Sequence, residues 1–306
     1  MDLISVLIPT FNVENYIEEA ILSISNQSYS NLEIIVIDDC SSDETYSRLL
    51  ELQKSDLRVK VYRNHQNTKI AETLNKAFEL SKGKYILRMD GDDISEPNRV
   101  YELHKFLKNN PEIDLLGSHT LTIDEDGNEI GRNQFPFTEK ACYNCLKYKM
   151  SPVAHIWLAK RIVYENLVPY RFPSVEDYDF LLRAKTSGFR FTNLPKYLYQ
   201  VRIREGNTIS TEGLLQRKAS IFAYQQYLLR NQNLPETPEK FFKLKNSFGF
   251  SLLNSFHKTS NFFIAKAIKE DGMLLKIFYA SIAVSFSPYY QIPYLINRIN
   301  YKRKLI

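Results

Sequence analysis

The carboxylates at residues 90–93 have the type and spacing that a divalent cation requires. Asp90–Gly91–Asp92–Asp93 directly follows an apolar run at residues 85–89, so two carboxylates flank a glycine where an extended segment ends. In that position they can turn toward one point and supply the hard oxygen ligands that Mg²⁺ or Mn²⁺ prefers when it bridges a diphosphate. The alternative interpretation is a solvated acidic turn, because isolated strings of this kind are common.

A second acidic pair, Asp38 and Asp39, follows the β-branched run at residues 34–37. A carboxylate there could accept a hydrogen bond from the N–H of a base or from a ribose hydroxyl. The Ser41–Ser42–Asp43 segment that follows is typical of a helix cap, and capping is the competing interpretation for this stretch.

A third pair, Glu176 and Asp177, directly precedes the apolar segment 180–184. Carboxylates in a first helical turn are stabilised by the helix dipole, so one interpretation is simply the start of a helix. The functional interpretation is a general base that faces a substrate hydroxyl.

The elements that must position these groups alternate along the first third of the chain. Apolar runs and helical periodicity predict strands at residues 3–8, 34–37, 59–62 and 85–89, with helices beginning near residues 13, 43 and 70. This alternation predicts an α/β domain with a mostly parallel sheet covered on both faces, which binds ligands at the carboxyl ends of its strands. The acidic groups at residues 38–39 and 90–93 lie at such ends.

The usual glycine-rich nucleotide loops are absent from this sequence. Neither G-x-G-x-x-G after the first strand nor G-x-x-x-x-G-K-[ST] occurs. Phosphate must therefore be bound by something else, and a metal held by carboxylates is the obvious substitute.

The later part of the chain changes character. Further strands are predicted at residues 113–122, 152–158 and 189–193, with helices at 100–109 and 178–186, and from about residue 211 the pattern is mainly helical.

Composition excludes several classes of protein. The 306 residues are 44% hydrophobic and 25% charged, which does not fit a disordered or collagen-like chain. Three cysteines cannot form a disulfide framework, and Cys142 and Cys145 lack the partners of a zinc site, so a reducing compartment is expected. Asp2 follows Met1 and the apolar run at residues 3–9 is too short for a signal peptide, so a cytoplasmic protein is expected.

The net charge of +5 is concentrated at the C-terminus. No acidic residue follows Asp271, whereas five basic residues do, so the body of the protein is neutral and nucleic-acid binding is not expected. The basic residues are Lys276, Arg298, Lys302, Arg303 and Lys304.

Residues 277–297 carry no charge, but Pro288 and Pro293 with several polar residues make them a poor membrane span. Two interpretations remain open. The segment lies on an anionic membrane surface, which would make the protein peripheral on the inner face of the cytoplasmic membrane, or it forms a helical lid with a solvated basic end.

The order of the motifs resembles family 2 glycosyltransferases of the GT-A fold, the nucleotide-sugar transferases of bacterial surface polysaccharide synthesis. The resemblance covers roughly residues 3–210 and rests on four segments in order: SVLIPTFNVENYIEEAILSISNQSYSNLEIIVIDDCSSDET, ILRMDGDDISEPNR, SPVAHIWLAKR and VEDYDFLLRAKTSGFRFTNLPKYLYQVRIREGNTIS. It implies a catalytic domain at residues 1–210, with a nucleotide-sugar half at about 1–99 and an acceptor half at about 100–210. Residues 211–306 would form a helical extension with the basic tail.

The resemblance also implies roles for single residues on the donor side. Thr10, Phe11 and Asn12 match the segment that lines the nucleotide pocket, and Asp39, with Asp38 beside it, matches the acid that binds the base. Arg88 and Asp90 match positions near the ribose and diphosphate.

On the reaction side, Asp92 matches the final Asp of the D-x-D motif, which holds the metal together with Asp90. Asp177 matches the catalytic base of the E-D motif, so Glu176 beside it is expected on the acceptor side. His155 matches a histidine near the acceptor in one subgroup, with a core histidine as the alternative.

The sequence departs from the family pattern in three places. Asn67–Thr68–Lys69 stands where Asn-x-Gly is usual, and Cys40 replaces a common glycine. Where many members have Arg-x-His, this chain has Arg202 and then Arg204, which would contact the phosphates directly unless metal binding is simply weaker. No Q-x-x-R-W string follows, which favours transfer of a single sugar.

The resemblance therefore implies an inverting hexosyl- or N-acetylhexosaminyl-transferase that depends on Mn²⁺ or Mg²⁺. Its donor would be a UDP-sugar and its acceptor a hydroxyl of a glycan or of a lipid-linked sugar. The competing interpretations are an inactive homologue that binds nucleotide as a scaffold and a sugar nucleotidyltransferase.

Overall fold

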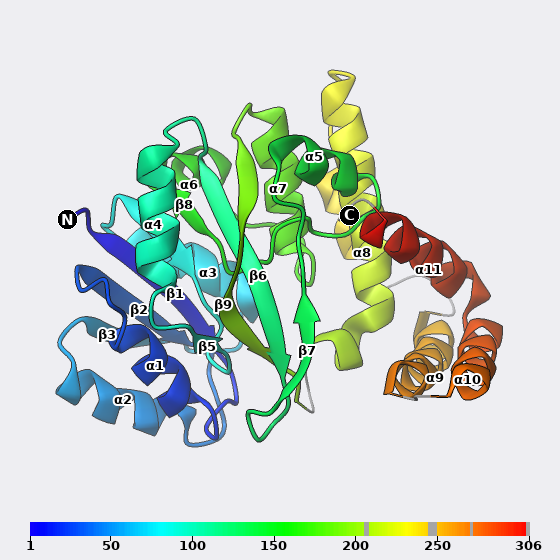
Figure 1. Ribbon diagram of the computed structural model, residues 1–306, viewed down its shortest axis with the longest axis horizontal. Coiled ribbons are helices and arrows are strands. Elements are labelled where there is room, and N and C mark those ends of the chain that lie inside the picture. Colours follow the sequence, from blue (N-terminus) through cyan, green and yellow to red (C-terminus); the bar gives the residue numbers. More distant parts are fainter. Residues whose placement is uncertain (205–207, 244–249, 270–271, 304–306) are drawn as a thin grey trace. The chain divides into compact units, whose positions relative to one another are not determined.

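The computed structural model describes residues 1–204, 208–243, 250–269 and 272–303 (Figure 1). Contacts divide the chain into two compact units. The first contains residues 1–146 and 151–203, and the second contains residues 147–150 and the described residues from 204 onward.

The described part of the first unit contains one nine-stranded sheet in the order β3-β2-β1-β4-β8-β6-β9-β5, with β7 paired to β6 (Figure 1). The strands are β1 (Ile4–Thr10), β2 (Leu32–Asp38), β3 (Val59–Arg63), β4 (Tyr85–Arg88), β5 (Ile94–Ser95), β6 (Leu115–Ile123), β7 (Glu129–Asn133), β8 (Leu158–Lys160) and β9 (Phe191–Arg202).

The first four strands are parallel, as predicted. β1 and β2 are buried at every residue, which explains why they are continuous apolar runs rather than alternating ones. In the other half, β6 and β9 are parallel, whereas β5, β7 and β8 run antiparallel to their neighbours. The sheet as a whole is therefore mixed, and the expectation of a mostly parallel sheet holds for its first half.

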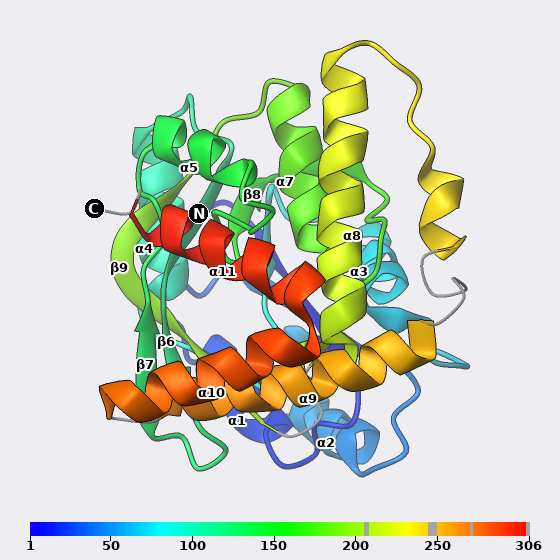
Figure 2. The same ribbon diagram turned by 90° about the vertical axis from the view of Figure 1, so that its right-hand side faces the viewer.

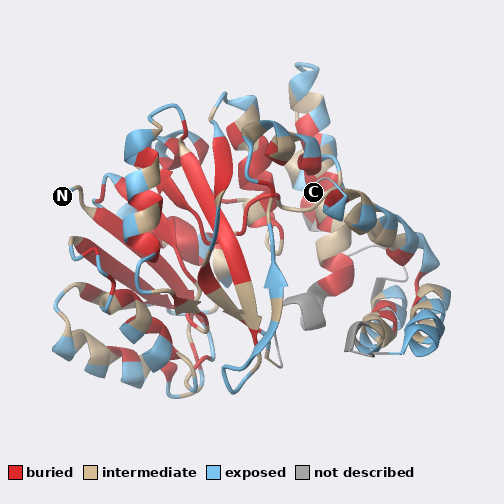
Figure 3. Ribbon diagram, viewed as in Figure 1, coloured by how far each residue is buried: buried red, intermediate tan, exposed pale blue. Residues whose placement is uncertain are grey.

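Helices cover both faces of this sheet, with α1, α2 and α4 on the near side of Figure 1 and α3 and α6 on the far side. The helices of the first unit are α1 (Ile17–Ser25), α2 (Thr45–Ser55), α3 (Lys69–Leu80), α4 (Arg99–Asn109), α5 (Glu139–Leu146), α6 (Arg161–Leu167) and α7 (Glu176–Thr186). In α1 the buried residues recur at helical spacing, at Ile17, Ala20, Ile21 and Ile24. The core lies between these helices and the strands, where buried residues concentrate (Figure 3).

The strand predicted at residues 152–158 is wrong except for its last residue, where β8 begins. Two carbonyls of this segment are bonded to side chains instead of to a neighbouring strand. The carbonyl of Pro152 accepts a hydrogen bond from the amide of Asn193 at 2.9 Å, and that of Ile156 accepts one from the guanidinium of Arg99. Because these carbonyls already have partners, an apolar stretch can stay buried without pairing as a strand.

The second unit is helical, as predicted. Its described elements are α8 (Thr208–Asn231), the short 3₁₀ helix η1 (Pro238–Lys243), α9 (Phe250–Lys269), α10 (Met273–Phe286) and α11 (Pro288–Lys302) (Figure 2). Among the residues that the structure describes, none of the helices is long and apolar enough to cross a membrane.

Candidate active site

The predicted donor-side residues lie at one edge of the sheet because β1, β2 and β4 are parallel. Thr10 ends β1, Asp38 ends β2 and Arg88 ends β4, and Thr10 is directly paired with Asp38. The edge where a ligand was expected is therefore the edge where these three side chains lie.

Asp39 is buried, and its carboxylate holds the segment that follows β3. Its Oδ1 accepts hydrogen bonds from the Asn64 side-chain amide and the Thr68 backbone N–H, both at 2.8 Å, and its Oδ2 accepts one from the Lys69 N–H at 2.9 Å. The predicted contact of Asp39 with a nucleotide base stays a prediction.

Asp38 is fully buried and pairs through Oδ2 with the Nε of Arg63 at 3.1 Å. The same oxygen accepts a hydrogen bond from the Ser41 backbone N–H at 3.2 Å, within the turn that follows β2. In the segment expected to cap the next helix, Asp43 Oδ1 accepts a hydrogen bond from the Thr45 N–H at 3.1 Å, although the N-cap residue of α2 itself, Glu44, makes no side-chain cap bond. Asp38 Oδ1 is buried and has no hydrogen-bond partner among the described residues.

The loop after β1 is tied to the loop after β2. The backbone N–H of Asn12 donates to Ser41 Oγ at 3.0 Å, and its side-chain oxygen accepts from the Ser42 N–H at 2.9 Å. Phe11 lies in the chain between the last residue of β1 and Asn12, and it is 43% exposed. A fixed backbone with an outward aromatic ring suits the predicted nucleotide pocket, where the ring can contact a base.

Two of the departures from the family pattern share one backbone feature. Cys40, after β2, has a φ of +64°, and Lys69, at the start of α3, has a φ of +72°. This left-handed conformation costs an ordinary L-residue about 1–2 kcal/mol and costs glycine almost nothing. The positions where glycine was expected are therefore positions where the backbone still has the conformation that glycine favours.

Beyond β4, the side chains of Asp90, Asp93 and His155 converge. One potential ligand atom from each lies within 4.8 Å of the other two. His155 Nε2 lies 2.8 Å from Asp90 Oδ2, and the Asp90 backbone N–H donates to the hydroxyl of Tyr199 at 3.0 Å. His155 therefore belongs to the acidic cluster and is not simply a core histidine.

The charges in this cluster act on one another. Burial opposes ionisation of Asp90, but the charge and hydrogen bond of His155, with the charge of Arg88, outweigh it and hold the pKa of Asp90 below its usual range. Burial lowers the pKa of His155, but Asp90 outweighs it and the net pKa is raised. For Asp93, burial and then repulsion from Asp92 and Asp90 raise the pKa well above its ordinary value.

This donor set fits a divalent cation. Asp90 Oδ1 is buried without a hydrogen-bond partner among the described residues, and carboxylate oxygens with one imidazole nitrogen are ligands that Mn²⁺ accepts. A cation would also relieve the repulsion that raises the pKa of Asp93.

The cluster contains Asp93 where the sequence pointed to Asp92. Asp93 Oδ1 accepts a hydrogen bond from the Arg202 backbone N–H at 2.8 Å, and the carbonyl of the partly buried Asp92 accepts one from Arg202 Nε at 3.0 Å. The sequence offered two adjacent aspartates, and spacing alone could not tell which of them faces Asp90. The role of Asp92 as a metal ligand stays a prediction.

On the other side of Asp90, Arg88 forms a buried ion pair with Glu176. Arg88 Nη2 lies 2.9 Å from Glu176 Oε1, and Arg88 Nε lies 3.8 Å from Asp90 Oδ1. Burial lowers the pKa of Arg88, but Glu176 and Asp90 outweigh it, so the net pKa is raised. Arg88 Nε and Nη1 have no hydrogen-bond partners among the described residues.

Asp177 follows Glu176 in the first turn of α7, where the helix dipole favours a carboxylate. It is partly exposed, and its charge contributes to the pKa of Arg88, of His155 and of Glu176. The E-D pair and the acidic cluster are therefore electrostatically linked and belong to one site.

The backbone that presents Asp177 is held by buried ion pairs. Asp179, fully buried one turn into α7, pairs with Arg171 at 2.7 Å and with Arg183 at 2.9 Å. The loop before the helix contains two residues with positive φ, Phe172 at +37° and Ser174 at +74°. Strain of this kind persists only where the surroundings determine the backbone.

Arg202, which the sequence marked only as the start of a departure from the family pattern, is a structural residue of the site. It is 3% exposed, and besides its bonds to residues 92 and 93 it pairs with Glu19 at 2.5 Å. It thus ties the end of β9 to the acidic turn. Arg204, predicted to contact the phosphates, belongs to the second unit, and its predicted contact stays a prediction.

Comparisons with known proteins show the family to which this chain belongs. A sequence profile described as glycosyl transferase family 2 matches residues 5–167. An uncharacterized glycosyltransferase of Haemophilus influenzae is 33% identical over 223 residues, which cover 68% of this chain and 68% of that one. A putative teichuronic acid biosynthesis glycosyltransferase of Bacillus subtilis, TuaG, is 34% identical over 105 residues, 34% of this chain and 42% of that one.

Solved structures show the same fold. S. aureus TarS in complex with UDP has a TM-score of 0.59 at 20% identity, covering 98% of this chain and 92% of that one. The mannosyltransferase PcManGT from Pyrobaculum calidifontis, in complex with GDP-Man and Mn²⁺, has a TM-score of 0.56 at 17% identity, covering 99% and 86%. These likenesses confirm the predicted α/β GT-A fold with its helical C-terminal region.

The profile spans more than half of the chain and includes the donor-side edge, the acidic turn and His155. On that match, this chain belongs to glycosyl transferase family 2 and is a glycosyltransferase.

Proposed function

We propose that this chain is an inverting transferase, dependent on a divalent cation, that moves one sugar from a UDP-sugar to an acceptor hydroxyl. The observation that carries the proposal is the linkage of two carboxylate groups in one site: the acidic turn at residues 90–93 and the E-D pair of α7. The first would face the departing diphosphate, and the second would face the incoming alcohol. The catalytic chemistry is ascribed to the predicted domain at residues 1–210.

The leaving nucleoside diphosphate develops negative charge, and the site offers fixed positive charge to meet it. Arg88 brings a buried guanidinium with two N–H-bearing nitrogens, Nε and Nη1, that have no hydrogen-bond partner among the described residues. Asp90 and Asp92, with Asp93 and His155 beside them, would hold Mn²⁺ or Mg²⁺, which when bound neutralises the diphosphate oxygens. Preorganised charge of this kind stabilises the transition state without reorganisation at the moment of reaction.

Asp177 would accept the proton of the acceptor hydroxyl as that oxygen attacks the anomeric carbon. Attack from the face opposite the diphosphate inverts the configuration of the sugar. General-base assistance of this type typically contributes about 10²–10⁴-fold. Glu176 would orient Arg88 beneath the site, and the partly exposed position of Asp177 leaves it able to reach an acceptor.

UDP is proposed as the nucleotide because the resemblance favours it and because TarS binds it, although PcManGT binds GDP-Man. A glycan or lipid-linked acceptor in cell-surface polysaccharide synthesis is proposed because TuaG is named for teichuronic acid biosynthesis. The reaction would take place in the cytoplasm.

A binding panel tests the proposal first. Thermal shifts are measured with UDP-GlcNAc, UDP-glucose and GDP-mannose, each with and without Mn²⁺. The proposal expects a stabilising shift with a UDP-sugar that is larger when Mn²⁺ is present. The absence of a thermal shift with every one of these donors would contradict the proposal.

Turnover and stereochemistry complete the test. Slow hydrolysis of the bound donor, followed by proton NMR of the anomeric signal, reports the first-formed sugar before mutarotation. An α-linked donor should give the β-sugar. Donor binding without any hydrolysis or transfer would favour the scaffold interpretation instead.

A further inference from the structure

Helices α9 and α10 of the second unit form a pair with a buried inner side (Figure 2). The hydroxyl of Ser260 on α9 donates to the carbonyl of Ala283 on α10 at 2.6 Å, and both residues are fully buried. Phe263 stacks on the rings of Tyr279 and Phe286 at centroid distances of 6.2 and 6.1 Å. These contacts satisfy one side of each helix.

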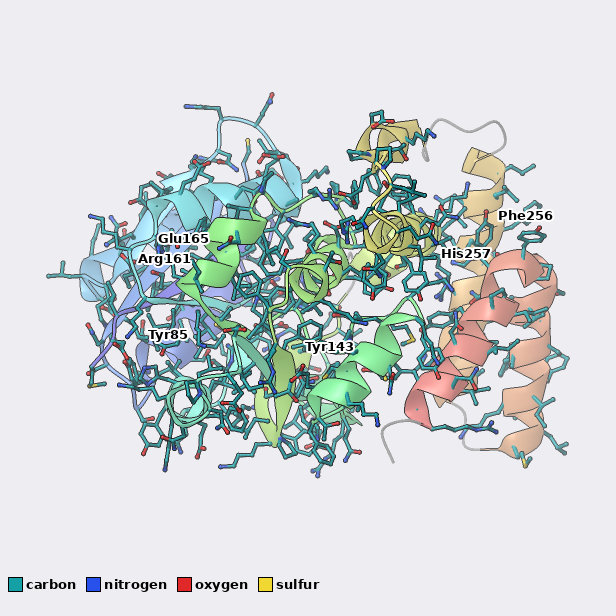
Figure 4. All side chains as sticks on the ribbon, turned by 90° about the horizontal axis from the view of Figure 1, so that it is seen from above. Tyr85, Tyr143, Arg161, Glu165, Phe256 and His257 are labelled. Carbon is teal, nitrogen blue, oxygen red and sulfur yellow. The ribbon has the colours of Figure 1, made fainter. Side chains whose placement is uncertain are left out.

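The outer side of the pair is apolar and exposed. Figure 4 shows the difference within α9, where Phe256 points outward and is 43% exposed, whereas its neighbour His257 is fully buried. In α10 only Ala283 is buried, and most of that helix is exposed or intermediate (Figure 3).

More than half of the large hydrophobic side chains that are exposed in the described residues lie in α9, α10 and α11. On α10 they include Leu274 at 85%, Met273 at 76% and Phe278 at 54% exposed. This concentration of exposed apolar side chains in one part of the chain favours an interaction site, because ordinary surfaces expose large apolar side chains singly. The remaining members are Leu252, Leu253, Phe256, Phe262, Leu275, Ile277, Phe286, Tyr289, Ile292, Ile296 and Ile299.

The charges on the same three helices are all positive. No aspartate or glutamate occurs in residues 250–269 or 272–303. The basic residues there are Lys258, Lys266, Lys269, Lys276, Arg298, Lys302 and Arg303. Glu270 and Asp271 lie between α9 and α10 in the chain, so the segment has an excess of positive charge. An apolar surface with excess cationic charge is complementary to a layer that is apolar inside and anionic outside.

We propose that the exposed face of α9, α10 and α11 docks on an anionic lipid surface. The 14 residues of α10 would extend about 21 Å as a helix, which is shorter than the hydrocarbon core of about 30 Å. The helix therefore lies in the interface with its apolar side chains among the acyl chains, and the basic residues contact the headgroups. The predicted contact at residues 277–304 is thus extended to include α9 and the start of α10 at Met273.

A second copy of the chain is a poorer occupant for this face. A symmetric dimer built on it would bring together two surfaces that each have an excess of positive charge, and such juxtaposition is unfavourable. The docking is independent of the transferase reaction, so it can be tested without any sugar donor.

Vesicle flotation with the full chain tests the proposal. Vesicles of phosphatidylcholine alone are compared with vesicles containing 40% phosphatidylglycerol, at low and at high salt. The wild-type chain should float with the anionic vesicles at low salt and much less with the neutral ones. Leu274→Gln/Phe278→Gln should reduce the partition coefficient by at least about tenfold, because two buried side chains no longer contribute apolar area.

Two further variants separate the components. Lys302→Gln/Arg303→Gln should weaken binding and flatten its salt dependence, because two headgroup contacts are lost. Leu57→Gln/Ile130→Gln removes two exposed apolar side chains of the first unit and should float like wild type.

Several results would overturn the proposal. They are no flotation of the wild-type chain, equal flotation with neutral vesicles, or unchanged flotation of the α10 variant. A wild-type dimer that the α10 variant dissociates, seen by light scattering, would assign the face to a second copy. A face protected from hydrogen exchange without vesicles and deprotected in the α10 variant would assign it to the lid interpretation. UDP-sugar binding, measured on the same samples, reports separately on the proposed function.

Discussion

Arg88 at the end of β4 and Glu176 at the start of α7 are 88 residues apart in the chain and 2.9 Å apart in space. Both residues are buried. Their ion pair joins the end of the parallel strand β4 to α7, the helix that carries Asp177. The donor side and the acceptor side of the proposed reaction are therefore connected by a charged contact and not only by packing.

Removing one partner of this pair should be costly. Glu176→Leu leaves the Arg88 guanidinium buried with the more distant Asp90 and Asp177 as counter-charges, and we expect a loss of about 3–5 kcal/mol in unfolding free energy. Arg88→Met/Glu176→Leu removes both charges and should cost clearly less than the sum of the single changes. Urea unfolding of the four proteins in a double-mutant cycle measures the coupling. Additive losses would show that the pair is not energetically coupled.

The two strained positions should respond favourably to glycine. At Lys69, which is exposed with a φ of +72°, relief of about 1–2 kcal/mol is partly offset by the larger entropy of the unfolded chain, about 0.4–1 kcal/mol. Lys69→Gly should therefore stabilise the protein by about 0.5–1 kcal/mol, and Cys40→Gly should act in the same direction. Lys105→Gly, at an exposed position inside α4, is the matched control and should destabilise by about 1 kcal/mol. Destabilisation by Lys69→Gly as large as the control's would refute the strain argument.

Asp90 is common to the predicted metal site and to the observed cluster. We expect Asp90→Asn to weaken Mn²⁺-dependent UDP binding by at least about tenfold, as removal of one charged ligand usually does. Titration calorimetry with and without Mn²⁺ measures the effect, and Asp92→Asn and Asp93→Asn in parallel identify the second carboxylate by the larger loss. A Mn²⁺ dependence that all three variants retain would contradict a metal site in this turn.

His257 should make the second unit sensitive to acid. Burial, with a smaller contribution from Arg217, lowers its pKa to about 4, and its Nδ1 lies 2.9 Å from the hydroxyl of Ser287. Between pH 6.5 and 4 the unfolded chain binds the proton and the folded one does not, so stability is complete above about 6.5 and falls as the pH is lowered toward 4. Proton NMR of the imidazole should give a pKa near 4, and His257→Gln should flatten the fall. An imidazole titrating near 6.5 would contradict this environment.

The sequence predicted the first half of the sheet well because its strands are buried on both faces. In runs such as residues 34–37 every residue is apolar, so polar and apolar residues do not alternate. The run could therefore be assigned as a strand without knowing which of its sides faces the core. The strands of the second half are different. β7 is largely exposed, and in the segment before β8 two carbonyls are bonded to the side chains of Asn193 and Arg99, a tertiary arrangement that no local pattern records.

The sequence predicted those parts of the site that are contiguous motifs. It did not predict which side chains face one another, because that depends on contacts between segments far apart in the chain. The acidic turn and the E-D pair were identified as chemical groups from spacing alone. Which of Asp92 and Asp93 faces Asp90 depends on the hydrogen bond from Arg202 on β9, more than 100 residues away. The contact of His155 with Asp90 depends in the same way on a segment that the sequence misassigned as a strand.

Asp177→Asn tests the central claim most directly. The change keeps the size of the side chain and removes its basicity, so we expect transfer or donor hydrolysis to fall by at least about 100-fold. The Kd for UDP-sugar with Mn²⁺ should stay within about twofold of wild type. Asp126→Asn, in the exposed turn before β7, is the matched control and should leave both quantities unchanged. Turnover near the wild-type rate in Asp177→Asn would contradict the assignment of the proton acceptor, and with it the proposed reaction at this site.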